Sequence, residues 1–385
     1  MTWRTLAMLG IAACGVAARA ADSGQAPADA WPMFRGCAEG TGRSAAAISL
    51  PLVEHWHRGF DKTAFGATPV IASDTIYIGD LDGTFHALAV GDGQTRWSFK
   101  AEAAGFTSAA AVSLDAGHPF VVVGDDTGVV RCFDRGSGKL AWEYETDGEI
   151  SGGPTIIAAA DGPRALVGSQ DASLSCLALA DGRLLWKHEI ADQIRCSPTV
   201  ADGHVFLAGC DGKLHVIDVD TGTEKAAVPI DGPTGTTPAA HEDRVFFGTE
   251  GGGFFAIDFR AATVAWKTAP AANAQAYRSS ATLAADLAIV GSRGKAVEAF
   301  SLADGTRRWR QPMRGRVDGS PVFAGGVVFV GDMAGRIVAL DPADGKTVWE
   351  FDAGGGFTGS PAVAADRLVI ASDDGTIWCF RSGNR

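Results

Sequence analysis

Aspartate and glycine recur together in this sequence in a pattern that could indicate a calcium site. The three richest segments are Asp80-Leu81-Asp82-Gly83, Asp125-Asp126-Thr127-Gly128 and Asp373-Asp374-Gly375. Clustered carboxylates suit hard cations, but an EF-hand loop also needs an acid at its twelfth position and a helix on either side, which these segments lack. Aspartate and glycine equally satisfy the geometry of tight turns. We therefore interpret these segments as hairpin turns and expect no metal ligands in them.

Other residue types with metal-binding or catalytic chemistry do not form a recognisable set. The eight histidines occur singly except for His55 and His57, which would share one face of a strand. No third ligand lies nearby in the sequence, so we interpret the pair as an exposed strand face. Serine, histidine and aspartate occur without a G-x-S-x-G elbow or a similar local signature. The sequence therefore predicts no catalytic residue, no metal site and no cofactor.

Composition and charge limit the classes of function. The 385-residue chain has a formal net charge of −12 and no basic cluster, which argues against a nucleic-acid partner because like charges repel a phosphate backbone. Glycine accounts for 50 residues without a collagen-like period, which indicates many tight turns. Closed all-β architectures of this length fold as one unit, so the length does not require several domains.

The N-terminus has the features of a secretory signal. An apolar run from Leu6 to Ala18 follows a short basic start and leads into Ala18-Arg19-Ala20, an A-x-A cleavage pattern. This predicts a signal peptide at residues 1–20 and an extension over residues 21–51. The preceding residues also fit a lipobox in which Cys14 would be lipidated, so both routes stay open. Either route predicts export, with membrane contact only through a lipid anchor.

Tryptophans recur every 40 to 45 residues and reveal an internal repeat. They are Trp56, Trp97, Trp142, Trp186, Trp266, Trp309 and Trp349. The single interval of 80 residues contains a copy that has Ala226 in place of its tryptophan. Each copy holds three short apolar runs separated by turns and a fourth run that opens at the tryptophan, which predicts a four-stranded antiparallel sheet. Eight such sheets around an axis bury a continuous core, so residues 52–385 are predicted to form an all-β, eight-bladed β-propeller.

The ends of the repeat predict how the ring closes. The eighth copy reaches Phe380 and the chain ends at Arg385, before a fourth strand could form. Residues 52–57 stand upstream of the first copy with no blade of their own. We expect this N-terminal strand to pair with the strand around Trp378 and to complete the last blade, because closure removes the open edge.

Three copies end in Ala-Asp-Gly followed by tryptophan four residues later: Ala180-Asp181-Gly182, Ala303-Asp304-Gly305 and Ala343-Asp344-Gly345. This ending resembles the tryptophan-docking motif of the quinoprotein dehydrogenase-like (PQQ-like) propellers. That family includes methanol-dehydrogenase-type enzymes and the outer-membrane assembly lipoprotein BamB. The resemblance spans residues 52–385 and implies that the seven tryptophans dock each blade on the next. Residues 31–36 also resemble a segment that often precedes such propellers.

The resemblance implies two alternatives, a binding scaffold and an enzyme. Enzymes of the family usually carry adjacent cysteines over the quinone and long insertions that cap the ring, whereas this sequence has no Cys-Cys pair and leaves no segment for a cap. We therefore expect a non-catalytic, monomeric, BamB-like periplasmic scaffold whose protein partner belongs to the outer-membrane barrel assembly machinery. The alternative is a propeller that binds a quinone or another small ligand, as an oxidoreductase or a sensor.

The resemblance also suggests partner-binding residues. BamB-like relatives bind the barrel-inserting protein through an apolar-Arg stretch that enters one blade and acidic residues that enter the next. The counterparts in this sequence are Ile194, Arg195 and Asp231. Asp192 stands where the relative has leucine and Gly235 where an acid is expected, so the match is incomplete.

The seven cysteines include no C-x-x-C pair of the kind that binds zinc. Cys132, Cys176 and Cys379 fall at one position of the repeat, which other copies fill with Ala87 and Ala339. A position that accepts either alanine or cysteine is a small packing site, so we expect these three thiols to be buried and unreactive.

The fourth copy combines a missing tryptophan with a pair of cysteines. Truncating a buried tryptophan to alanine, as at Ala226, costs about 3–5 kcal/mol. Cys196 and Cys210 stand at the two ends of the first hairpin, opposite each other or one register step apart if the turn centres on Asp202-Gly203. We expect a disulfide in an oxidising compartment, worth about 3 kcal/mol. The alternative is two reduced thiols in small packing sites.

Peptide mapping tests this bridge. Protein exported to the periplasm, then denatured and alkylated without reduction, should yield a peptide that joins Cys196 to Cys210, because an oxidising compartment favours the bond. Cys132 is the internal control and should be recovered alkylated. Recovery of Cys196 and Cys210 in alkylated form would exclude the disulfide.

Overall fold

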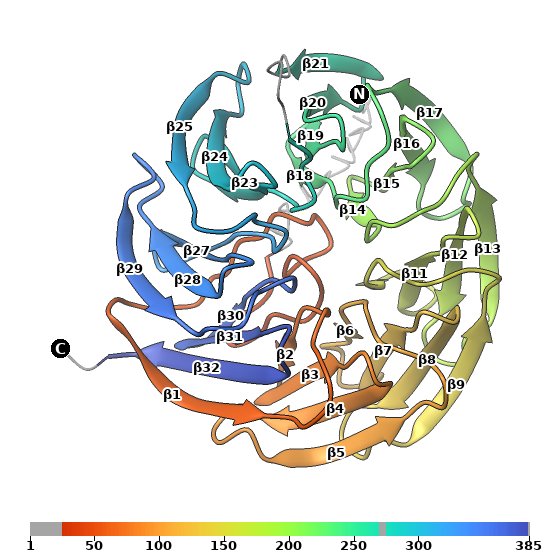
Figure 1. Cartoon of the computed structure of the whole chain (residues 1–385). Helices are drawn as coiled ribbons and strands as arrows, with labels where there is room; N and C mark the ends of the chain where they lie inside the picture. The colour runs from red at the N-terminus through yellow and green to blue at the C-terminus, as the bar shows by residue number, and fades with distance from the viewer. Residues whose placement is uncertain (1–24, 269–274, 384–385) are drawn as a thin grey trace, which may run out of the picture.

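The computed structural model describes residues 25–268 and 275–383 of the chain. The predicted signal peptide, residues 1–20, and the lipidation candidate Cys14 lie outside the described residues. Within them, thirty-two strands form eight four-stranded antiparallel sheets that stand around one axis (Figure 1). The prediction of an all-β, eight-bladed propeller is confirmed. The described residues contain no helix that is long and apolar enough to cross a membrane.

The first four blades follow one another along the chain, and in each the first strand lies at the axis and the fourth at the rim. Their strands are, in blade 1, β2 (Val70–Ala72), β3 (Thr75–Gly79), β4 (Thr84–Ala89) and β5 (Thr95–Lys100); in blade 2, β6 (Ala111–Val112), β7 (Phe120–Gly124), β8 (Val129–Asp134) and β9 (Leu140–Glu145); in blade 3, β10 (Thr155–Ile157), β11 (Arg164–Gly168), β12 (Ser173–Ala178) and β13 (Leu184–Glu189); in blade 4, β14 (Thr199–Ala201), β15 (His204–Ala208), β16 (Lys213–Asp218) and β17 (Glu224–Pro229).

The next three blades repeat this order, and the last blade takes its outer strand from the other end of the chain. Their strands are, in blade 5, β18 (Ala239–His241), β19 (Arg244–Gly248), β20 (Phe254–Asp258) and β21 (Thr263–Lys267); in blade 6, β22 (Thr282–Ala284), β23 (Leu287–Ser292), β24 (Ala296–Ser301) and β25 (Arg307–Pro312); in blade 7, β26 (Val322–Ala324), β27 (Val327–Gly331), β28 (Arg336–Leu340) and β29 (Thr347–Asp352); in blade 8, β30 (Ala362–Ala364), β31 (Arg367–Ala371), β32 (Thr376–Ser382) and β1 (Leu52–Gly59).

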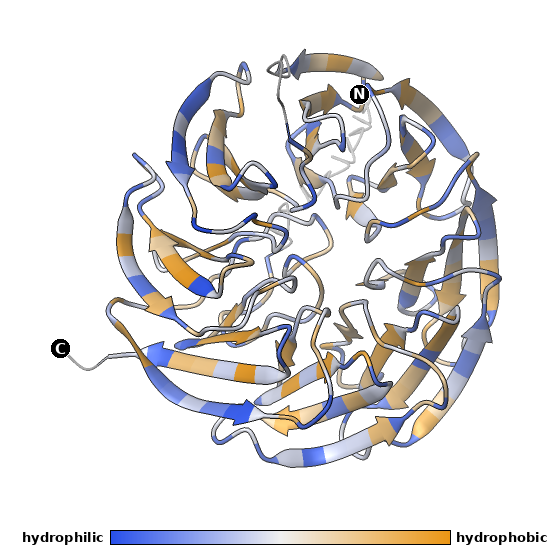
Figure 2. Cartoon of the chain, viewed as in Figure 1, coloured by the Kyte–Doolittle hydropathy of each residue, from blue (hydrophilic) through white to orange (hydrophobic). Residues whose placement is uncertain are grey.

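The burial of the strands follows from their place in the ring. Strands in the middle of a blade, such as β3 and β11, bury every residue because both of their faces pack against neighbouring blades. Outer strands such as β5 expose every second residue and alternate between polar and apolar side chains (Figure 2). The hydrophobic core is therefore a series of apolar layers between blades, which run around the axis.

The N-terminal strand closes the ring as predicted. β1 pairs antiparallel with β32, so that Trp56 lies opposite Cys379 and His57 opposite Trp378. Figure 1 shows β1 on the outer side of β32, so that the first and the last strand of the propeller lie in one blade. A bulge between Glu54 and Trp56 shifts the register once. The pairing gives blade 8 the outer strand that the other blades have, so β32 is not left as an edge strand.

Each repeat tryptophan docks its blade on the next one. The indole Nε1–H donates to a main-chain carbonyl of the following blade, at 2.8–3.2 Å. Six of the seven rings also lie against a glycine with φ between +70° and +75°, where an added Cβ would stand 2.5–2.8 Å from the ring. These glycines are Gly93, Gly138, Gly182, Gly222, Gly305 and Gly345. Glycine is needed at these positions for two reasons, the left-handed backbone and the close approach of the ring.

The contact between blades 4 and 5 replaces tryptophan and glycine with other residues. Ala226 stands at the tryptophan position of β17, and Ala262, with φ +53°, stands where the following blade would have glycine. Phe259 is 4 % exposed and its ring lies 4.8 Å from that of Phe206, in the same apolar cluster as Ala226. Aromatic packing of Phe259 on Phe206 thus accompanies the absence of the indole at this contact. This contact stabilises the blade without a disulfide, a solution that the sequence analysis did not foresee.

The cysteines of blade 4 lie at the ends of its first hairpin, as expected, and the structure holds both as thiols. The register places them one step apart, since Thr199 pairs with Phe206 and Ala201 with His204. Cys196 packs in the core between blades 3 and 4, whereas the Cys210 thiol lies 3.7 Å from the Thr234 carbonyl oxygen. A bond between the two sulfurs requires Cys210 to leave this carbonyl, and the disulfide stays a prediction.

The three cysteines at the shared repeat position are fully buried, as predicted. Cys132, Cys176 and Cys379 have no exposed surface, and neither have Ala87 and Ala339 at the same position of other blades. Burial raises the pKa of the Cys176 and Cys379 thiols to about 12 and raises that of Cys132 as well. These thiols therefore stay protonated at neutral pH and are unreactive.

Removing the closing strand tests how much stability the ring closure contributes. Deletion of residues 52–57 should lower the midpoint of thermal unfolding by about 10 °C or more, because blade 8 loses its outer strand and Trp56. Trp56 is partly buried; loss of a fully buried tryptophan costs about 3–5 kcal/mol, and each kcal/mol shifts the midpoint of a large domain by about 2–4 °C. The control is Val53→Ser, at an exposed position of the same strand. An unchanged melt after the deletion would contradict the closure.

A matched pair of glycine substitutions tests the docking contact. Gly305→Ala adds a Cβ 2.5 Å from the Trp266 ring at φ +72°, whereas Gly203→Ala adds one at φ +74° with no atom within 4 Å. Gly203→Ala should cost about 1–2 kcal/mol through the left-handed backbone alone. Gly305→Ala should cost about 1–3 kcal/mol more, because the ring must move. Urea unfolding measures both free energies, and equal losses would show that the ring contact does not matter.

Candidate functional site at the channel mouth

The residues that precede the propeller fill one end of its central channel. Backbone hydrogen bonds join residues 28–42 to the inner strands or the adjoining turns of blades 1, 2 and 4 to 8: Ala28 to Ala365, Trp31 to Ile71, Pro32 to Val112, Ala38 to Val200, Glu39 to Ala240, Thr41 to Leu283 and Gly42 to Phe323. The inner strands have only two or three residues and would otherwise leave these groups unpaired. In Figure 1 this segment crosses the centre of the ring. We call residues 28–44 the channel plug.

A buried arginine anchors the plug. Arg35 is 1 % exposed, and its Nη2 donates to the carbonyl oxygens of Ala281 and Pro321, at 2.9 and 2.7 Å. These carbonyls belong to the turns that lead into blades 6 and 7. Desolvation lowers the pKa of Arg35 to about 9. Because this value is still above neutral pH, the guanidinium stays charged. Gly42 leaves room for the group, since a Cβ there would collide with Arg35 Nη2.

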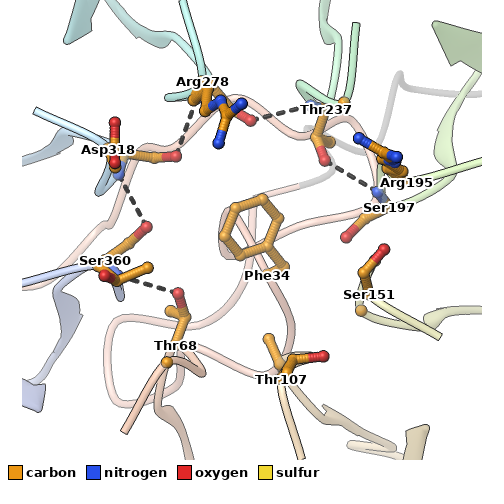
Figure 3. A pocket seen from close by; sticks show the side chains of 18 of the residues that line it. Phe34, Thr68, Thr107, Ser151, Arg195, Ser197, Thr237, Arg278, Asp318 and Ser360 are labelled. Atoms are coloured by element: carbon orange, nitrogen blue, oxygen red, sulfur yellow. Dashed lines mark hydrogen bonds between the residues drawn. The ribbon is translucent and has the colours of Figure 1, made fainter. Parts of the chain in front are cut away.

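A belt of hydroxyl side chains surrounds the channel above the plug. The hydroxyl oxygen in one blade accepts the backbone N–H of the residue at the same repeat position in the preceding blade, at 2.8–3.0 Å. The belt runs from blade 4 through blade 8 to blade 1 and consists of Ser197, Thr237, Ser280, Ser320, Ser360 and Thr68. Figure 3 shows four of these groups, Thr68, Ser197, Thr237 and Ser360, around the ring of Phe34, which belongs to the plug. Ala109 and Gly153 interrupt the belt in blades 2 and 3.

Above the belt the channel opens into a cavity of about 350 Å³ with a positive lining. The lining includes Arg195, Arg278, Arg293 and Arg316 but only one carboxylate, that of Asp318. Arg293 forms a bidentate ion pair with Asp318, with both distances at 2.9 Å, and this hydrogen-bonded pair raises the pKa of Arg293. Arg316 Nε lies 3.3 Å from the same carboxylate. One acid therefore faces two arginines, and the lining keeps an excess of positive charge.

The other two arginines extend this site sideways. Arg195 contacts the Gln193 amide oxygen, and Arg278 Nε donates to Glu250 at 2.9 Å, near the surface. Both also line a second cavity of about 520 Å³ that borders the first and includes Glu149, Glu250 and Pro233. We call the two cavities together the channel mouth. It lies on the connections between blades and on turns within blades, where binding residues of rigid scaffolds commonly occur.

Comparison with known proteins places this chain in a family. The family model described as outer membrane protein assembly factor BamB matches residues 126–225, 211–299 and 293–385, which is more than half of the chain. The chain belongs to this family. No curated protein sequence matches it.

Solved structures share the fold of this BamB-family chain at low sequence identity. BamB from Moraxella catarrhalis is 19 % identical, with a TM-score of 0.71 over 86 % of this chain and 100 % of the other. A europium-containing methanol dehydrogenase is 12 % identical, with a TM-score of 0.73 over 92 % and 98 % of the two chains. The quinohemoprotein alcohol dehydrogenase from Comamonas testosteroni is 13 % identical, with a TM-score of 0.74 over 94 % and 82 %. These likenesses show the fold, which enzymes and the non-enzyme BamB share.

The three residues that were predicted to bind a partner lie in different surroundings. Ile194 has no exposed surface and packs in the core, as do residues at the same repeat position such as Ile150 and Phe357. The expectation that Ile194 contacts a partner is therefore corrected. Arg195, the next residue, lies at the channel mouth. Asp231 is exposed but lines neither cavity of the mouth, and its carboxylate accepts a hydrogen bond from Thr249 Oγ1 at 2.8 Å.

Three arginines of the mouth escaped the sequence analysis. Arg278 occupies the same repeat position as Arg195, two residues before the belt serine, so a comparison of the copies at this position would have found it. Arg293 lies in a turn between two strands of blade 6, and Arg316 lies between blades 6 and 7. Arg316 is two residues from Asp318 in the same connection, whereas Arg293 reaches Asp318 only through the tertiary structure.

The remaining candidates have structural roles. Asp80 and Asp125 accept backbone N–H groups within their own turns, at 2.7 and 3.0 Å, which confirms the turn interpretation. His55 contacts the Gly91 carbonyl oxygen, whereas His57 contacts the Glu54 carboxylate. The two histidines therefore do not converge on a common point.

Proposed function

We propose that this chain is a non-catalytic, monomeric, BamB-like scaffold that binds an acidic segment of a protein partner at the channel mouth. The observation that carries the proposal is the charge of the first cavity of that mouth. Four arginines and one carboxylate line the first cavity of a chain whose formal net charge is −12. A local excess of positive charge on an acidic protein directs an acidic ligand to one place.

The geometry of the channel supports a partner that sits on the mouth. The plug crosses the channel below the belt, so an incoming segment meets Phe34 and cannot pass through the ring. Arg195 and Arg278 stand near the surface with polar neighbours and have donors left for a carboxylate. Arg293 and Arg316 both contact Asp318, which holds their guanidinium groups at the wall of the first cavity.

The proposal includes the surroundings of the protein. Residues 1–20 would direct export, residues 21–51 would form the extension that contains the plug, and residues 52–385 would form the propeller. The partner would belong to the outer-membrane barrel assembly machinery, as the family description suggests. The protein would be periplasmic and would touch the membrane only through a lipid on Cys14, with no nucleic acid and no cofactor. The alternative is a quinone- or small-ligand-binding propeller.

Affinity purification from detergent-solubilised envelope tests the proposal. The wild-type chain should retain barrel assembly proteins, and Arg195→Glu/Arg278→Glu should reduce the retained amount at least about tenfold, because a central arginine of an interface is commonly worth about 2 kcal/mol or more. The control is Lys139→Glu/Arg308→Glu, which makes the same change of charge at exposed positions outside both cavities.

The control variant should bind like the wild type, and binding should weaken as salt increases, because salt screens exposed charges. Equal retention of all three proteins would contradict the role of the mouth. A bound chromophore in the purified chain, without barrel proteins, would instead favour the small-ligand alternative.

A further inference from the structure

Two histidines and a glutamate meet between the outer strands of blades 3 and 4, away from the channel. His188 lies on β13, the outer strand of blade 3, whereas His215 lies on β16 and Glu224 on β17 of blade 4. One donor atom from each residue lies within 4.8 Å of the other two. His188 Nε2 is 4.0 Å from Glu224 Oε1, and His215 Nδ1 is 2.6 Å from the same oxygen.

A buried carboxylate orients His215 in this group. His215 Nε2 lies 3.0 Å from Asp211 Oδ2, and both side chains are only 4 % exposed. Because the Asp211 carboxylate has no hydrogen to donate, Nε2 carries the proton and donates it. Nδ1 lies 2.6 Å from an oxygen of a second carboxylate, Glu224 Oε1, a hydrogen-bond distance at which a proton lies between the two atoms. A metal ion bound here would replace that proton and move the two atoms apart.

The donor set fits a divalent transition-metal ion. Two imidazoles and a carboxylate are ligands that zinc prefers, with a fourth position left for water. Bonds of about 2.0–2.2 Å place the ligand atoms of a tetrahedral site about 3.3–3.6 Å apart. The three donors, 2.6 to 4.8 Å apart, reach this spacing through small side-chain movements. Asp211 supplies the outer carboxylate that commonly fixes a metal-binding histidine.

The repeat shows that other residue types can occupy these positions at a blade contact. The same two positions at other blade contacts are occupied by a residue of the outer strand and a facing residue of the next blade that pack or form a hydrogen bond. Three such pairs are Phe99 with Arg131, Tyr144 with Ser175, and Phe351 with Trp378. Among the described residues, a pair of histidines with a carboxylate occurs only between blades 3 and 4.

We propose that His188, His215 and Glu224 bind a divalent transition-metal ion, of which Zn²⁺ fits best, and that the ion joins blade 3 to blade 4. Glu224 is 39 % exposed and His188 is 16 % exposed, so the ion can enter from the rim. The site is separate from the channel mouth and does not depend on the proposed function. Its ligands come from two blades, so binding stabilises the folded ring and does not occur in the unfolded chain.

Zinc titration of the full chain tests this site. The protein, purified without a polyhistidine tag and stripped with a chelator, should bind one Zn²⁺ in calorimetry. Zinc at about a hundredfold excess over the dissociation constant should raise the thermal midpoint by roughly 5–10 °C. His188→Gln and Glu224→Gln should abolish both effects, and Asp211→Asn should weaken binding by about 10–100-fold. The control is His241→Gln, at an exposed position of β18, which should bind like the wild type.

Cobalt provides a measurement that does not depend on the variants. Co²⁺ added to the wild-type chain should give the strong visible absorption of a four-coordinate site, which Zn²⁺ then displaces. Absence of zinc binding by the wild type would overturn the proposal and assign a proton to the space between His215 and Glu224. Zinc binding that persists in both His188→Gln and Glu224→Gln would place the ion elsewhere and would also overturn it.

Discussion

Each blade of this propeller can bury its two faces only against its neighbours, and the other features of the structure depend on that requirement. The middle strands are buried on both sides, so a blade at an open end would expose an apolar face to water. The pairing of β1 with β32 removes that end by joining residues from the two ends of the chain in one sheet. The belt at the axis and the tryptophans at the rim then hold the blades at a constant spacing.

The contacts between blades are built from residues that depend on each other. Six of the seven tryptophans lie against a glycine of the following turn, where a Cβ would stand 2.5–2.8 Å from the ring. The contact of blades 4 and 5 lacks both partners at once and uses Phe259 against Phe206. The contact of blades 3 and 4 carries two histidines where other contacts carry aromatic or polar packing pairs. The repeat thus keeps the shape of each contact while its chemistry varies.

Rigidity of the ring also determines where function can lie. The plug and its anchor Arg35 occupy one end of the channel, so the opposite mouth presents the open surface. Arginines from different blades stand there around Asp318, in a chain that is acidic as a whole. Family membership agrees with a binding role, whereas the fold alone is shared with quinone-dependent enzymes.

The sequence by itself determined the repeat, the number of blades, the closing strand and the buried cysteines at one repeat position. These follow from local rules, namely alternation along strands, turn chemistry and a period of 40 to 45 residues, which act within one copy. It also pointed to Arg195, through a resemblance, but placed Ile194 at the surface when that position faces the core. Only the tertiary structure brought Arg278, Arg293 and Arg316 to one mouth, and His188 to His215. Their convergence depends on the angle and distance between blades, which the packing of whole blades sets and which no single copy of the repeat contains.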